Sequence, residues 1–314
     1  MKVNIFILVV LYVVYFGVLI TLGYLSYKMP SFLKGKPNKS SEENEEIKVT
    51  SQNYIYTIIL LSIVGILVNT YILVQGTALE SHLMEWLNII IRVMHITFGI
   101  AWIGASFYFV FLENALNRTE DVREELAGNL WAVHGGGFYY LEKYKVAPKT
   151  IPKDLHWFKY EAYFTWLSGF CLLFVVYYFN ASAFLIDKNV LDITATQGIL
   201  IGVGSFVVSW LIYDLMCKSA LIKNQLAFAI IGFIILIGFA WFYCHVFSAR
   251  AAYIHFGAMI GSIMVANVFF VIIPSQKAMV KAAKLGLPLD PTLGKKALAR
   301  CTTTILHCLF CLSW

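Results

Sequence analysis

Charged side chains are scarce in this sequence. Asp, Glu, Lys and Arg make up 13% of its 314 residues, whereas apolar residues reach 60%. A soluble domain is about a quarter charged and near half apolar, so this balance excludes an ordinary water-soluble fold. The net charge of +6 does not indicate nucleic-acid binding, because the Lys and Arg residues lie in segments between apolar runs. Such a chain is solvated by lipid.

Cysteine is also sparse, and its placement does not favour a disulfide framework. Three of the six cysteines lie within apolar runs, at Cys171, Cys217 and Cys244, where cysteine usually packs as a small hydrophobic residue. The pair Cys308-Leu-Phe-Cys311 fails as a haem c attachment motif, because Leu312 follows where histidine is required. The sequence also lacks zinc-finger, phosphate-loop and Ser-His-Asp patterns, and any internal repeat typical of transporters built from two related halves.

Long apolar runs predict an all-α fold, a polytopic transmembrane helix bundle with about seven spans. A bilayer core needs about 20 apolar residues per helix, and suitable runs lie near residues 4–27, 54–76, 85–112, 160–184, 198–216, 226–247 and 251–273. The run Ile5–Leu25 is too long for a signal-peptide core and lacks a small-residue cleavage site, so we interpret it as a retained span. The polar stretch after it is typical of a flexible linker.

Loop charge predicts the orientation of the spans. Lys and Arg are frequent at 28–48, 113–159, 218–223 and 277–300, and they are few in the intervening loops. Because cytoplasmic loops carry the excess of Lys and Arg, the amino terminus is predicted outside and residue 300 inside. In the longest loop, three glycines follow His134 and predict either a backbone turn or a close approach to a ligand.

Ionisable groups at membrane depth are costly, so each is a candidate functional residue if it faces the bundle interior. Five such groups enter from the outer side of three predicted spans: Arg92, His95, His245, Arg250 and His255. Arg92 and His95 are three residues apart and share a helix face. Arg250 lies in a short outer turn, which places His245 and His255 at similar depth. We predict that the five converge in the outer half of the bundle as a redox or anion site.

The histidines have two interpretations. Neutral imidazole is a common axial ligand of haem iron, and two histidines from different helices would hold a haem b. Alternatively, each histidine hydrogen-bonds a neighbouring helix or lies at the membrane interface. The candidate ligands are His95, His245 and His255, with His134 as a further cofactor-binding candidate. The others lie next to span ends or in the tail and are interpreted as structural: His82, His156 and His307.

Arg92 and Arg250 are the candidate substrate-binding residues. A guanidinium keeps its charge and donates two parallel hydrogen bonds, which suits a planar molecule with carbonyl groups or an anionic edge. The alternatives are that Arg92 pairs with Glu85 and that Arg250 extends its charge to the membrane interface.

Four long strings occur in order along the chain, starting at His95 (HITFGIAWIGASFYF), Leu130 (LWAVHGGGFY), His156 (HWFKYEAYFTWLSG) and Arg250 (RAAYIHFGAMIGSIMVANVFFVIIP). With them, residues 84 to 300 resemble the membrane domain of the bacterial membrane-bound urate oxidases, also called urate hydroxylases. The resemblance implies oxidation of urate to 5-hydroxyisourate in purine breakdown, in the inner membrane of a bacterium. It also implies an eighth span and a cytochrome c domain that takes the electrons.

The chain departs from that family at both ends. The expected regions are an amino-terminal extension with two spans at 1–80, a membrane domain with about five spans at 81–300, and an atypical tail at 301–314. The tail lacks the family's continuation, and a shifted reading frame would restore a similar segment, so we hypothesise a frameshift. Haem c is expected only in a full-length form.

Together these features predict a membrane-bound urate-oxidising enzyme. Urate would be held by Arg92 or Arg250, and its electrons would leave through haem b to a cytochrome c or another respiratory-chain acceptor. Two alternatives stay open: a haem-binding membrane electron-transfer subunit without urate chemistry of its own, and a purine permease.

Overall fold

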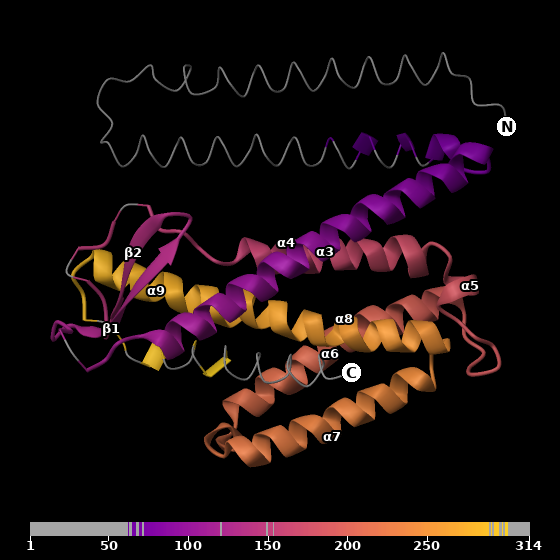
Figure 1. The fold of residues 1–314 in the computed structure, drawn as a ribbon. Helices are drawn as coiled ribbons and strands as arrows, with labels where there is room; N and C mark the ends of the chain where they lie inside the picture. The colour runs from indigo at the N-terminus through magenta and orange to yellow at the C-terminus, as the bar shows by residue number, and fades with distance from the viewer. Residues whose placement is uncertain are drawn as a thin grey trace, which may run out of the picture. The chain divides into compact units, whose positions relative to one another are not determined.

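The computed structural model, shown in Figure 1, describes residues 62, 65–66, 69–70, 72–119, 121–148, 150–152, 154–288, 290, 292–294, 297 and 299–300. The chain divides into two compact units, Met1–Trp86 and Leu87–Trp314. All site residues discussed below belong to the second unit. The predicted span at 4–27 lies outside the described residues, as does most of the one at 54–76.

Five helical segments of the described chain are long and apolar enough to cross a membrane. With the labels of Figure 1, they are α3 (Ala78–Ala115), α4 with its π-helical continuation η1 (Tyr160–Leu173, Phe174–Tyr178), α6 (Ala195–Lys218), α7 (Gln225–Cys244), and the run of α8, π-helical η3 and α9 (Ala249–Asn267, Val268–Ile272, Ile273–Lys284). The short helices α5 (Ala181–Phe184) and η2 (Ala220–Lys223) connect them. The all-α bundle and the five predicted spans from 85–112 onward are confirmed.

Side-chain caps fix where two of these helices begin. At α6, the Thr194 hydroxyl accepts a hydrogen bond from the Gln197 N–H, and the Gln197 side chain accepts one from the Thr194 N–H. At α7, Asn224 Oδ1 accepts from the Ala227 N–H at 3.1 Å. Each cap satisfies amide groups that a helix start would otherwise leave without partners. The helices therefore begin close to the point where the apolar runs begin.

Helix α8 is the centre of the bundle. It packs against α4, α6 and α7, and Figure 1 shows it lying lengthwise between α4 and α7. Side chains from all four helical segments, η1 included, form the main hydrophobic core, among them Leu173, Phe206, Tyr243, Phe247 and Met259. Because α8 has neighbours on several sides, polar side chains on it are the ones most completely removed from lipid.

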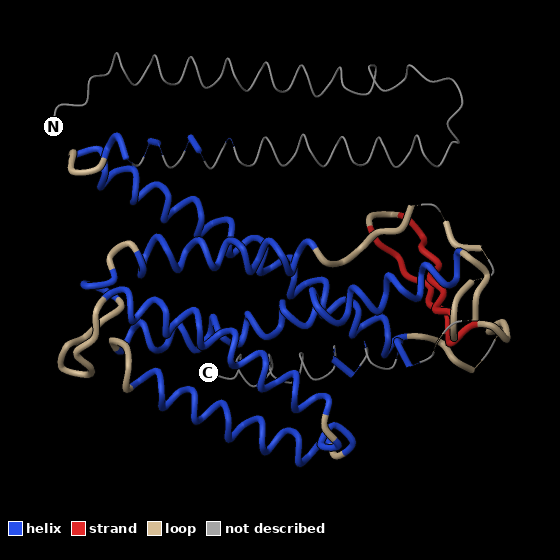
Figure 2. Tube along the Cα trace, turned by 180° about the vertical axis from the view of Figure 1, so that it is seen from behind, coloured by secondary structure: helices blue, strands red, loops and turns tan. Residues whose placement is uncertain are grey.

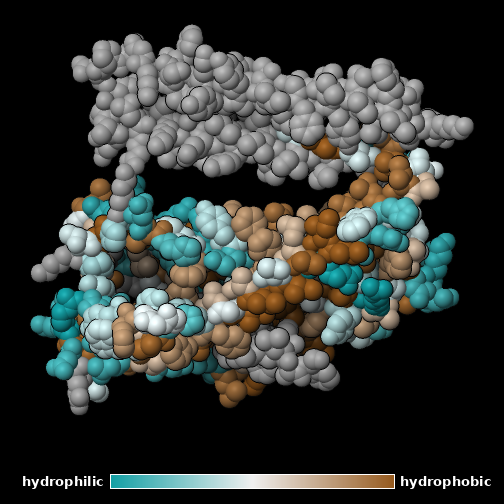
Figure 3. Space-filling view, turned by 45° about the horizontal axis from the view of Figure 1, so that its top comes forward, coloured by the Kyte–Doolittle hydropathy of each residue, from teal (hydrophilic) through white to brown (hydrophobic). Residues whose placement is uncertain are grey.

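Helix α3 is the opposite case, since none of its residues is buried. Ile100, Phe107 and Phe111 are each more than half exposed. Figure 3 shows hydrophobic side chains across the middle of the described helices and hydrophilic ones toward their ends. An exposed apolar surface of this extent marks contact with a membrane.

The predicted loop at 113–159 contains a β-hairpin, which the sequence reasoning did not foresee. Strands β1 (Leu126–His134) and β2 (Gly137–Tyr144) pair antiparallel, with His134 opposite Gly137. Gly135 and Gly136 both have positive φ, 56° and 79°, as a two-residue turn of type I′ requires. The glycine turn is thereby confirmed. Figure 2 shows the two strands in red beside one end of the helices.

Candidate functional site

His255 is the most enclosed of the predicted site residues, with no exposed surface. Its Nδ1 lies 2.8 Å from the Ala251 carbonyl oxygen, and its Nε2 lies 3.1 Å from Tyr178 Oη. A carbonyl can only accept, so Nδ1 carries the proton and Nε2 accepts a hydrogen bond from the Tyr178 hydroxyl. In its neutral form the imidazole is thus fixed in one tautomer, and both of its nitrogens have a hydrogen-bond partner.

The backbone of η1 and a glycine on α6 make this contact possible. Tyr177 and Tyr178 are consecutive, yet both are buried, at 4% and 5% exposure, and both belong to the π-helical segment. Widened turns of this kind inside α-helices frequently occur at functional sites. On α6, a Cβ at Gly202 would lie 3.0 Å from both His255 Nε2 and Tyr178 Oη. Only glycine leaves room there for the bonded pair.

Aromatic rings surround the imidazole. Phe206, Tyr243 and Phe247 place their ring centroids 6.0, 6.2 and 4.6 Å from that of His255. Tyr243 is fully buried, and its hydroxyl lies 2.7 Å from Ser205 Oγ. We call this cluster of His255, Tyr178 and the surrounding rings of Phe206, Tyr243 and Phe247 the His255 centre. Its polar atoms have partners within a shell of side chains that excludes water.

Arg250 lies at the edge of the His255 centre. Its guanidinium carbon is 5.9 Å from the centroid of the Tyr177 ring, a cation–π distance, and the Tyr177 ring is 6.2 Å from that of His255. Arg250 itself is exposed. The structure therefore brings together two of the five predicted groups, a buried imidazole and an exposed guanidinium joined by one tyrosine.

His95 lies elsewhere, at the contact of α3 with α4. Its Nδ1 is 3.0 Å from the Thr165 carbonyl oxygen and 3.3 Å from Ser168 Oγ. A Cβ at Gly169 would meet its ring at 2.7 Å, so this glycine admits the imidazole. From Gly169 to Tyr178 is nine residues, or roughly 13 Å along a helix. His95 and His255 are thus at different depths.

The other predicted groups are exposed and separate. Arg92 donates to Asn88 Oδ1 at 3.0 Å on its own helix, rather than pairing with Glu85. His245 bonds through Nδ1 to the Trp241 carbonyl at 2.7 Å and lies against that indole ring. His134 is exposed at the end of β1. No hydrogen bond or ring contact joins these groups to the His255 centre in the described part of the chain.

The haem prediction can be compared with this geometry. An axial ligand needs a free ring nitrogen, usually Nε2, while Nδ1–H donates to an oxygen. His95 and His245 meet this requirement in their hydrogen bonding, whereas Nε2 of His255 is occupied by Tyr178. His255 therefore does not fit as an axial ligand. The ligand assignments remain predictions, of which His95 is the better placed, since His245 is exposed.

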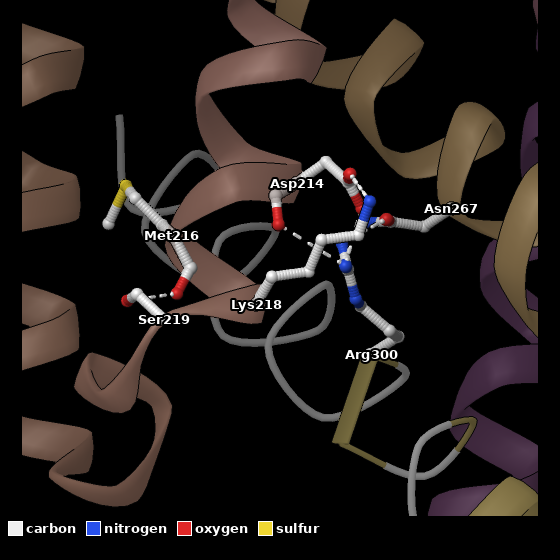
Figure 4. Close-up of polar contacts among 6 residues, drawn as sticks. All are labelled: Asp214, Met216, Lys218, Ser219, Asn267 and Arg300. Atoms are coloured by element: carbon white, nitrogen blue, oxygen red, sulfur yellow. Dashed lines mark hydrogen bonds and ion pairs between the residues drawn. The ribbon is translucent and has the colours of Figure 1, made fainter.

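A second polar centre was missed by the sequence reasoning. Arg300, 2% exposed, donates to Asp214 Oδ1 at 2.6 Å and to Asn267 Oδ1 at 3.1 Å. The Lys218 ammonium lies 2.5 Å from the other oxygen of Asp214, and the Arg300 guanidinium lies over the Tyr213 ring at 5.6 Å. Figure 4 shows the side chains of Asp214, Lys218, Asn267 and Arg300 converging from α6, α8 and the segment after α9.

A signal for this second centre was present in the sequence. Asp214 is a carboxylate within an otherwise apolar run, and Asn267 lies in the most apolar part of the last predicted span. The argument that flagged the histidines, that polar groups at membrane depth have partners and purposes, applies equally to them. Arg300 gave no such signal, because it is one of several cations that follow the last predicted span.

These helices and buried polar centres define a polytopic α-helical membrane protein. Comparison with family models identifies the family within this class. A model described as "Urate oxidase N-terminal" matches residues 81–308, which is most of the sequence, and the chain belongs to that family. No curated protein and no solved structure matches the chain.

Proposed function

We propose that this chain oxidises urate to 5-hydroxyisourate in the inner membrane of a bacterium and passes the electrons to a cytochrome c. Membership of the urate oxidase N-terminal family is the observation that carries the proposal. In this reaction urate and one water molecule together lose two electrons and two protons, and the water oxygen becomes the new hydroxyl group. The protein must therefore hold a planar purine, accept protons, and deliver electrons to a separate acceptor.

The Arg250 edge of the His255 centre suits the first two tasks. Arg250 is exposed and held over Tyr177, so its guanidinium is available to donate two parallel hydrogen bonds to a carbonyl or anionic edge of urate. In the same centre, His255 Nε2 accepts a hydrogen bond from the Tyr178 hydroxyl. Arg250 would orient the substrate, and the His255 and Tyr178 pair would move a proton.

Haem b is part of the proposal through His95. When bound, a haem carries one electron at a time between a two-electron donor and a one-electron acceptor. His95 would hold it through Nε2, with Nδ1 fixed on the Thr165 carbonyl. The second predicted substrate residue, Arg92, lies one helical turn before His95 and is exposed, so it is better placed beside such a cofactor than beside Arg250.

The test is urate consumption by membranes that contain the full chain, supplied with oxidised cytochrome c and monitored for urate loss, 5-hydroxyisourate formation and cytochrome reduction. Arg250→Gln is expected to lower the rate about 10- to 100-fold, because a hydrogen bond to a charged group contributes about 1.5–3 kcal/mol. Arg118→Gln, an exposed arginine paired with Glu113, is the matched control. Unchanged urate with a haem that other donors reduce would favour an electron carrier, and urate uptake without oxidation would favour a permease.

A further inference from the structure

An apolar groove lies between α6 and α7, and neither Arg250 nor His95 lines it. It has a volume of about 510 Å³, and its lining includes Gly204, Ser205, Val208, Gly238, Phe239 and Phe242. Val208 is 50% exposed at its mouth, and Gly238 is exposed as well. The groove is therefore open to the lipid that surrounds the bundle.

Two glycines keep the groove open. A Cβ built at Gly204 or at Gly238 would meet no atom within 4 Å. Glycines in membrane helices usually allow neighbouring helices to approach closely, and Gly202, one turn from the groove, does bring α6 against His255. At Gly204 and Gly238, in contrast, the space is left free. A groove of this size that faces the hydrocarbon core will be occupied by a molecule that partitions into lipid.

The groove has one buried polar side chain. Ser205 is 7% exposed, and its Oγ lies 2.7 Å from Tyr243 Oη and 2.6 Å from the Gly202 carbonyl oxygen. A serine hydroxyl has one donor and two acceptor sites and can rotate between partners. It can therefore donate to a ligand carbonyl, or accept from a ligand hydroxyl, while Tyr243 remains bonded to it.

The depth of Ser205 limits what the ligand can be. Helix α6 starts at Ala195 and has 24 residues, so it is about 36 Å long and Ser205 lies about 15 Å from its start. That position is near the middle of a hydrocarbon core about 30 Å thick. Phospholipid head groups remain at the interface, and only their apolar chains reach this depth. A molecule with polar oxygens on a ring that dissolves in the membrane interior matches both the wall and the hydroxyl.

We propose that this groove binds the head of an isoprenoid quinone, with one ring oxygen on Ser205 and the apolar tail extending into lipid. The serine hydroxyl suits both redox forms, since it can donate to a quinone carbonyl and accept from a quinol hydroxyl. Tyr243 connects the groove to the candidate site, because its hydroxyl bonds Ser205 and its ring contacts His255. The groove is thus one aromatic ring away from the proposed site of urate oxidation.

The binding site has a redox consequence that rests on the proposed function. Urate and one water yield 5-hydroxyisourate, two electrons and two protons, and a quinone takes up two electrons and two protons to become a quinol. The sum, urate plus water plus quinone giving 5-hydroxyisourate plus quinol, balances without a further reactant. A quinone would then serve as an electron acceptor in addition to a cytochrome c.

Binding is tested first, because it does not depend on activity. The full chain in phosphatidylcholine nanodiscs is photolabelled with an azido-benzoquinone that has a ten-carbon tail, and labelled peptides are mapped with and without excess decylubiquinone. Labelling of α6 or α7 beside the groove, removed by the competitor, is the expected result. Labelling that the competitor does not reduce, or that lies elsewhere, overturns the proposal.

Variants of the groove sharpen the test. Gly238→Leu fills the open space and is expected to abolish competed labelling, whereas Gly257→Leu, at another exposed helical glycine with no atom within 4 Å, leaves it unchanged. Ser205→Ala is expected to weaken competition by decylubiquinone about tenfold, as loss of one hydrogen bond predicts. Equal competition in Ser205→Ala and wild type would mean that only an apolar chain occupies the groove, and disulfide-linked dimers of Gly238→Cys would mean that a second copy does. Either result overturns the proposal.

Activity then separates the two proposals. Urate oxidation with cytochrome c that persists in Gly238→Leu, together with loss of urate-dependent quinone reduction, is the expected pattern. Competed quinone labelling in a chain that oxidises no urate would retain the binding site and remove the proposed function. Urate oxidation without competed labelling would retain the proposed function and remove the quinone-binding site.

Discussion

Nε2 of His255 lies 3.1 Å from the hydroxyl of Tyr178, and neither residue reaches the surface of the bundle. One of them lies on the central helix and the other on the π-helical end of the span that begins at Tyr160. The hydrogen bond therefore ties two spans together at a point from which water is excluded, and several expectations can be tested at and around it.

Replacing Tyr178 by Phe should destabilise the protein. The ring would still pack, but His255 Nε2 would be a buried acceptor without a partner, which costs about 1–3 kcal/mol. The measurement is the thermal unfolding midpoint of the purified chain in detergent. Tyr253→Phe is the matched control, because Tyr253 lies on the same central helix and is 72% exposed. An unfolding midpoint that is the same in both variants would contradict the hydrogen bond.

Two glycines of α6 should respond in opposite ways to the same substitution. In Gly202→Ala the new methyl group would lie 3.0 Å from His255 Nε2 and Tyr178 Oη, so the pair must separate, and overpacking of this kind typically costs about 1–3 kcal/mol. In Gly204→Ala the methyl group meets nothing within 4 Å, and alanine favours the helix by up to about 1 kcal/mol. Unfolding midpoints of the two variants should lie on opposite sides of wild type. Equal shifts would count against the close approach at Gly202.

In the second polar centre, loss of Asp214 and loss of Arg300 are expected to lower the stability of the protein by different amounts. Asp214→Asn leaves the buried Arg300 guanidinium without a carboxylate, and removal of one partner of a buried ion pair costs about 3–5 kcal/mol. Arg300→Leu should cost less, because Lys218 still bonds the Asp214 carboxylate. The test is urea or thermal unfolding of both variants, with Arg118→Gln as an exposed control expected within about 1 kcal/mol of wild type. A larger loss in Arg300→Leu than in Asp214→Asn would refute this account.

His95→Ala should remove haem b if His95 is its ligand, whereas His255→Gln should leave the haem in place. Both are read from the reduced-minus-oxidised difference spectrum of purified chain, independent of urate. Spectra that lose the haem bands in His255→Gln alone would reverse the assignment. A wild-type chain that carries no haem would remove the cofactor from the proposal.

The hairpin turn should tolerate asparagine but not valine. Gly136 has φ 79°, a region in which asparagine is several-fold enriched and β-branched residues are outliers. Gly136→Val is therefore expected to open the turn and speed cleavage near it in limited proteolysis, with Gly136→Asn close to wild type. Equal cleavage rates in the two variants would mean that the turn is not of this type.

Hydropathy predicted the fold well because a span is a property of composition along about 20 residues. The same patterns predicted that His255 is an interior residue and that a turn follows His134. They did not predict that five ionisable groups separate into several sites, because helix rotation and depth depend on packing among helices. The pairing of Asp214 with Arg300 joins residues 86 positions apart, which no local pattern encodes. The two inward-facing tyrosines depend on a widened helical turn that the sequence does not mark.

Helix α8 carries a member of each polar centre, His255 and Asn267, with its other neighbours on α4, α6 and α7. The two residues are about 18 Å apart along one rigid rod. Because one helix carries both residues, α8 acts as a spacer that sets the distance between the two polar centres.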